Sequence, residues 1–123
     1  HDPDPLPNGN ILIFDNQGYR GPGGMSRIAE FNPANGKIAW SYTGDDKNKF
    51  VTRWGGKQSM LPNGNVLISE NLRSRLFEVN RDGEIVWEMY NPLRAKADGK
   101  EFVATISGGH QRMSLDYPTF LDE

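Results

Sequence analysis

A near-identical internal repeat constrains this chain more than any other feature of its 123 residues. The segment Leu6-Pro7-Asn8-Gly9-Asn10-Ile11-Leu12-Ile13 returns 55 residues later as Leu61-Pro62-Asn63-Gly64-Asn65-Val66-Leu67-Ile68. Two further blocks recur in the same order, at offsets of 48 and 47 residues: Ser26–Phe31 with Ser74–Val79, and Gly36–Trp40 with Gly83–Trp87. Self-similarity at this spacing is typical of stacked supersecondary units, so the pattern indicates a repeat protein whose loops differ in length.

Each repeat predicts four short strands separated by turn residues. The expected strands are residues 1–6, 10–15, 27–32 and 37–42 in the first repeat, and 53–61, 65–70, 75–80 and 84–90 in the second. The Asn-Gly pairs predict type I′ hairpin turns, in which both central residues have positive φ. Four strands in each unit of about 45–55 residues favour an all-β fold of four-stranded antiparallel propeller blades.

We expect one partial β-propeller over residues 1–123. Blade one covers about 1–43, blade two about 53–90, and the start of a further blade or a closing strand about 101–121. The last assignment depends on Gly108-Gly109-His110-Gln111-Arg112-Met113, which resembles Gly55-Gly56-Lys57-Gln58-Ser59-Met60 at an offset of 53. Closed propellers have about four to eight blades, so we expect the remaining blades to come from a longer protein or from other copies. We favour the first, in which this chain of about two and a half blades is a C-terminal fragment. Residues 93–99 fit either a short helix or a loop.

Composition excludes several classes of function. The formal net charge is −2, without a basic block, which argues against nucleic acid as a partner. No run of about 18 apolar residues is present, so we expect no membrane span. Cysteine is absent, which excludes disulfides and thiolate metal sites. We find no calcium loop, zinc motif, phosphate-binding glycine loop or nucleophile elbow, and we expect no metal.

The first strand of each propeller blade lines a central channel, so equivalent ends of successive first strands converge. Three residue pairs fall at that end: His1 with Asp2, Lys57 with Gln58, and His110 with Gln111. The only two histidines of the chain therefore fall at a repeated position. With an unperturbed pKa of about 6.5, imidazole can act as nucleophile, base or acid near neutral pH.

Three arginines could complete an anion site, because a guanidinium matches sulfate or phosphate in a bidentate geometry. Arg20 lies in a glycine-rich loop and has no counterpart in blade two, Arg53 precedes the inner strand of blade two, and Arg112 follows His110. Other residues recur in both blades, and we interpret them as scaffold: Arg27 and Arg75, Glu30 and Glu78, and Trp40 and Trp87, whose rings we expect to pack between blades.

With these residues in place, the chain resembles the bacterial arylsulfotransferases, six-bladed propellers that move a sulfuryl group between phenols. The resemblance extends over nearly the whole chain. Its motifs are His1-Asp2, Leu6-Pro7-Asn8-Gly9-Asn10, Phe14-Asp15-Asn16 with Arg20, the repeated blocks above, and His110-Gln111-Arg112-Met113 followed by Asp116-Tyr117-Pro118. The pattern of histidine, Phe-Asp-Asn and arginine is the most specific of them.

The resemblance implies roles for individual residues. His1 and Arg20 match the sulfate-binding histidine and arginine, and His110 is the candidate nucleophile, sulfated in a ping-pong reaction between a phenolic sulfate donor and a phenol acceptor. It implies no organic cofactor and a periplasmic or secreted location. Lys57 and Gln58 depart from the family by standing where a histidine is expected. The further candidates for substrate binding are Arg53, Lys57, Gln58, Gln111 and Arg112.

Two other functions fit the same sequence. A non-catalytic propeller would serve as a binding or scaffold module. A quinone-dependent dehydrogenase is a weaker alternative, since it requires a calcium site and a broad cofactor pocket for which we identify no ligands.

Overall fold

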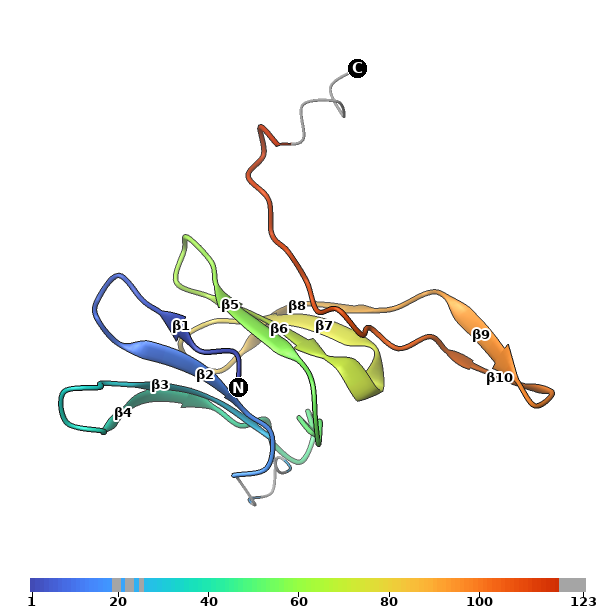
Figure 1. Cartoon of the computed structure of the whole chain (residues 1–123), viewed down its shortest axis with the longest axis horizontal. Coiled ribbons are helices and arrows are strands. Elements are labelled where there is room, and N and C mark those ends of the chain that lie inside the picture. The colour runs from blue at the N-terminus through green and yellow to red at the C-terminus, as the bar shows by residue number, and fades with distance from the viewer. Residues whose placement is uncertain (19–20, 22–23, 25, 118–123) are drawn as a thin grey trace.

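Two four-stranded antiparallel sheets form the body of the molecule (Figure 1). The computed structural model describes residues 1–18, 21, 24 and 26–117. Blade one contains β1 (Asp4–Pro5), β2 (Ile11–Asp15), β3 (Arg27–Phe31) and β4 (Ile38–Tyr42). Blade two contains β5 (Lys57–Met60), β6 (Val66–Glu70), β7 (Arg75–Val79) and β8 (Ile85–Tyr90), with a 3₁₀ turn, η1 (Asn71–Arg73), after β6. Each sheet pairs its strands in sequence order, as propeller blades do.

The segment after blade two differs from what the sequence predicts. Most of residues 93–99 form a strand rather than a helix or a loop: β9 (Arg94–Ala97) pairs with β10 (Lys100–Val103) across a turn at residues 98–99, and this hairpin projects away from both sheets (Figure 1). From residue 104 to residue 117 the chain continues as a tail without strands, and the rest of the segment lies outside the described residues.

The Pro-Asn-Gly turns connect strands as predicted, but their type is different. The Gly9 amide donates to the Leu6 carbonyl at 2.9 Å, and the Leu6 amide donates to the Asn10 carbonyl at 2.8 Å. Only the glycine has a positive φ, of 86°, which is the pattern of a three-residue hairpin loop rather than a type I′ turn. The reason is Pro7, whose ring holds φ near about −65° at the first position of the turn. The second copy, ending at Gly64, repeats this geometry.

A hydrophobic core lies between the two sheets. Phe50, in the connection from β4 to β5, is fully buried at its centre. Its ring lies 5.7 Å from Phe14 and Tyr42 of blade one and 5.6 Å from Phe77 of blade two, measured between ring centroids. Aliphatic side chains from both blades complete this core: Leu6, Leu12, Ile28, Val66, Ile68 and Val79.

Polar contacts also join the blades, and they involve the repeated residues. Glu30 is buried, and it accepts hydrogen bonds from Asn8 and Asn10 of its own blade and from Arg81 Nη2, at 2.6 Å, of blade two. The Arg81 guanidinium lies 4.5 Å from the ring centroid of Trp40, and the Trp40 indole donates to the Arg81 carbonyl at 2.9 Å. Trp40 therefore packs between the blades, as its repetition predicts.

Ion pairs confirm the scaffold interpretation of the two repeated arginines. Arg27 binds Asp15 at 2.8 Å in blade one, and Arg75 binds Glu70 at 2.7 Å in blade two. In both blades, therefore, the carboxylate that ends the second strand pairs with the arginine that begins the third. These side chains hold the strands together within each sheet.

Phe50→Ala should lower the free energy of unfolding by about 3–5 kcal/mol, since it removes the ring that contacts both blades and leaves a cavity. Chemical denaturation measures this change. Phe102→Ala, on the exposed face of β10, is the matched control and should change stability by only about 0.5 kcal/mol. Equal effects at the two positions would contradict a core centred on Phe50.

Candidate functional site

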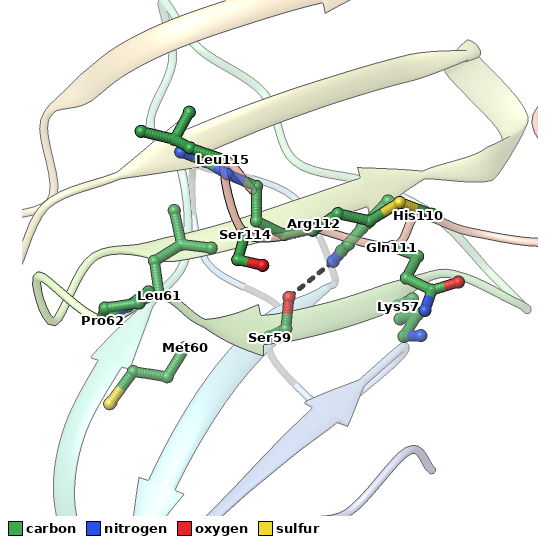
Figure 2. Close-up of a pocket in the computed structure, with 11 residues that line it drawn as sticks. Lys57, Ser59, Met60, Leu61, Pro62, His110, Gln111, Arg112, Ser114 and Leu115 are labelled. Atoms are coloured by element: carbon green, nitrogen blue, oxygen red, sulfur yellow. Dashed lines mark hydrogen bonds between the residues drawn. The ribbon is translucent and has the colours of Figure 1, made fainter. Parts of the chain in front are cut away.

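Three segments that are distant in sequence meet at one edge of the blades. One cavity, of about 370 Å³, is lined by His1 and Asp2, by the stretch from Gly55 to Lys57 at the start of β5, and by residues 107–109 of the tail. Asn71 of η1 completes the lining. The structure therefore brings together the three segments that the repeat places at equivalent first-strand ends. His110 itself lines a neighbouring cavity of about 510 Å³ (Figure 2). Lys57 lines both cavities.

His110 is held by two serines of blade two. Its Nε2 lies 2.7 Å from Ser59 Oγ on β5, and its Nδ1 lies 2.6 Å from Ser69 Oγ on β6. Figure 2 shows the first of these bonds at the wall of the larger cavity. A neutral imidazole has one N–H donor and one acceptor nitrogen. One serine hydroxyl therefore accepts from the ring, and the other donates to it.

The environment of His110 favours the neutral ring. The pKa of His110 is lowered to about 4, chiefly by burial and also by the Lys57 ammonium, while Asp2 opposes the shift. Since the ordinary pKa of histidine is 6.5, the ring is unprotonated at neutral pH. A neutral imidazole keeps one nitrogen lone pair, which is what a nucleophile requires.

The backbone of the tail explains how His110 reaches the blade. Gly109 has a φ of 75°, and a Cβ at this position would lie 2.9 Å from Lys57 Cβ. Only glycine allows the tail to pass this close to β5 in this conformation.

Sequence reasoning missed both serines, although the repeat contains a signal for them. Ser69 aligns with Phe14 of blade one at the offset of 55, and Ser59 aligns with Asp4. Phe14 is part of the apolar core between the blades, so a hydroxyl at the equivalent position of blade two breaks the pattern. A polar residue in blade two at the place of a core aromatic of blade one predicts that this face binds a polar group.

His1 lies at the same edge but in a different environment. Its ring is exposed and stacks on Phe14, with 5.1 Å between the centroids, and Nε2 lies 3.1 Å from the Gly56 carbonyl oxygen. This contact joins the first strand region of blade one to the start of β5. Arg20, the expected partner of His1, lies outside the described residues.

The other candidates fall into two groups. Gln58 is fully buried, and its side-chain amide donates to Asp2 and Asp4 of blade one, so its donor groups face the blade interface. Arg53 is exposed in the loop before β5, where its carbonyl accepts a hydrogen bond from Gln17. Gln111 and Arg112 are exposed and line the same cavity as His110.

Comparison with known proteins assigns the family. A family model described as arylsulfotransferase (ASST) matches residues 1–92, about three quarters of the chain. The chain belongs to the arylsulfotransferase family. The match covers His1 and Lys57, whereas His110, Gln111 and Arg112 lie beyond it. No curated protein matches the sequence.

The described residues also bear on membranes and metals. Within them, no helix has the length and apolar character needed to cross a membrane. In the same part of the chain, no three His, Asp or Glu side chains are grouped as they would be around a metal ion.

We predict that the His110 ring titrates at about pH 4, well below the ordinary histidine pKa of 6.5 that it has in the unfolded chain. Between these values the unfolded chain binds more protons than the folded one, so the free energy of unfolding should fall as the pH drops from 6.5 to about 4. Titration of the ring by NMR and denaturation over this range measure both effects. His110→Gln should remove this part of the slope, and an unchanged slope would contradict the burial of the ring.

Proposed function

We propose that this arylsulfotransferase family member transfers a sulfuryl group between phenolic compounds through a sulfated His110. The observation that carries the proposal is the His110 ring, oriented by two serine hydroxyls at the wall of a cavity that Lys57 also lines. An oriented, uncharged imidazole beside a cation has the arrangement of a nucleophile with a binding site for an anionic donor.

The two serines have different tasks in this mechanism. Ser69 Oγ accepts from Nδ1–H and holds the tautomer, which leaves the lone pair on Nε2. In the resting state the Ser59 hydroxyl donates to Nε2 at the cavity wall. The bound donor displaces this hydroxyl, Nε2 attacks sulfur, an N–S bond forms, and the S–O bond to the aryl group breaks as phenolate leaves.

The second half-reaction returns the enzyme to its starting state. The oxygen of an acceptor phenol attacks sulfur, the N–S bond breaks, and the phenolic proton is released as the aryl sulfate forms. Imidazole regains its lone pair on Nε2. The group transfer therefore requires no oxidant or reductant.

Positive charge supports the transferring group. The Lys57 side chain lines both the cavity of His1 and the cavity of His110, and its ammonium can neutralise sulfate oxygens there. By family resemblance, His1 and Arg20 also bind the sulfate group.

The larger cavity suits an aromatic substrate. Met60, Leu61, Met113 and Leu115 contribute apolar surface beside His110, and the volume of about 510 Å³ is within the usual range of small-molecule sites. Phenolic substrates follow from the family in general, and the periplasmic or secreted location is proposed on resemblance alone.

One observation favours the alternative of a binding or scaffold module. Both nitrogens of His110 already have serine partners, so the ring could serve only to hold the tail on blade two. The two functions differ in one property, which is whether Nε2 ever forms a bond to sulfur.

Sulfuryl transfer from p-nitrophenyl sulfate to phenol distinguishes them. The wild-type protein should release p-nitrophenol, and His110→Ala should lower the rate by at least about a thousandfold because the nucleophile is lost. Ser69→Ala should lower it about ten- to a hundredfold, since the tautomer is no longer held. Arg94→Ala, on the projecting hairpin, is the control and should retain full activity.

Mass spectrometry of the protein quenched with donor alone provides a second readout. We expect one added SO₃ on the peptide that contains His110 and none in His110→Ala. A folded protein that neither turns over nor becomes sulfated would favour the scaffold function.

A further inference from the structure

The site at which Arg81 binds blade one has an equivalent on blade two. In blade one, Glu30 and Trp40 are direct partners across β3 and β4, and together they bind the Arg81 guanidinium through an ion pair and the indole face. A guanidinium between a carboxylate and an aromatic ring is a favourable arrangement, because the planar cation forms hydrogen bonds to the carboxylate at its edge and a cation–π contact with the ring at its face.

Blade two repeats this receptor. Glu78 and Trp87 are direct partners across β7 and β8, and Asn65 Nδ2 donates to Glu78 Oε1 at 2.7 Å, as Asn10 does to Glu30. Trp87 is 46% exposed, and among the described residues Glu78 has no ion-pair partner. The receptor is therefore built on blade two but lacks the cation that Arg81 supplies on blade one.

The tail brings an arginine to this receptor. A cavity of about 470 Å³ lies over the same face of blade two, and Glu78, Trp87 and Arg112 all line it, together with His110. Among the described residues in this lining, Arg112 carries the only guanidinium. It is two residues from His110, which the two serines already attach to the blade.

We propose that Glu78 and Trp87 form a guanidinium-binding site for Arg112, which clamps the tail on blade two and keeps His110 against Ser59 and Ser69. Arg112 is then a positioning residue rather than a ligand of the substrate. This inference does not depend on sulfuryl transfer, because the clamp would also exist in a scaffold module.

The alternatives to Arg112 are less favourable. A second copy of the chain could place the turn between β3 and β4 of its blade one against the receptor. That turn, residues 32–37, contains Pro33 and Ala34 where the equivalent turn of blade two has Arg81, so it offers no guanidinium. Arg112 is also tethered, so its effective concentration at the receptor reaches about millimolar without a second chain.

Titration of His110 by NMR in Glu78→Gln and Arg112→Gln tests the clamp. A glutamine side chain retains an oxygen that can accept from Asn65, so Glu78→Gln removes the charge without removing that contact. In either variant, release of the tail should move the pKa of His110 from about 4 toward 6.5. The double variant should add nothing to the single changes. Arg94→Gln and Arg81→Gln should leave the pKa of His110 where it is in the wild type.

Trypsin provides a second readout, since it cleaves after Arg112. A clamped arginine is protected, so Glu78→Gln should accelerate formation of the fragment ending at Arg112 about fivefold. Unchanged titration and unchanged cleavage would overturn the proposal. A Trp87 indole signal that shifts with protein concentration would also overturn it, because the occupant would then come from another copy. Neither readout requires turnover. The tests can therefore overturn the clamp without overturning sulfuryl transfer, and they can support the clamp in a protein that transfers no sulfuryl group.

Discussion

The packing of Phe50 between the two sheets is the interaction on which the rest of the structure depends. Each sheet has an apolar face that four short strands cannot bury alone. Phe50 lies in the connection between the blades. Its ring contacts Phe14 and Tyr42 of blade one and Phe77 of blade two, so it joins the apolar faces of the two sheets. This interface fixes the separation of β1 and β5, and hence of His1 and Lys57, at the edge where the candidate site forms.

The site itself arises where the second blade departs from the first. Blade one uses Phe14 for the core, whereas the equivalent Ser69 of blade two turns a hydroxyl toward the tail and binds His110. A duplicated scaffold thus supplies the position, and the serine at the place of Phe14 supplies a hydrogen-bond partner for the imidazole. Burial against this face keeps the imidazole neutral by lowering its pKa, which links packing directly to the reactivity proposed for the ring.

The arginine receptors are also repeated in the two blades, but among the described residues only the receptor of blade one has its arginine bound. Blade one shows what a complete receptor contains, since Glu30 and Trp40 are both engaged by Arg81. On blade two the carboxylate and the indole are present, and the tail that carries the candidate nucleophile also carries an arginine into the same cavity. Stability of the tail and placement of His110 would then have one physical origin.

By itself the sequence determined the blades, because the alternation and spacing of the repeated blocks indicate four short strands in each unit without reference to distant contacts. It also identified Trp40, Arg27 and Arg75 as scaffold residues. The sequence also contained the cause of the turn type, because the proline ring fixes φ at Pro7 and overrides the Asn-Gly preference. Only the tertiary structure showed the hairpin of β9 and β10, since these strands match no block of the internal repeat. It alone placed His110 between Ser59 and Ser69, since these serines lie 51 and 41 positions away in sequence and meet the ring only when the tail crosses blade two.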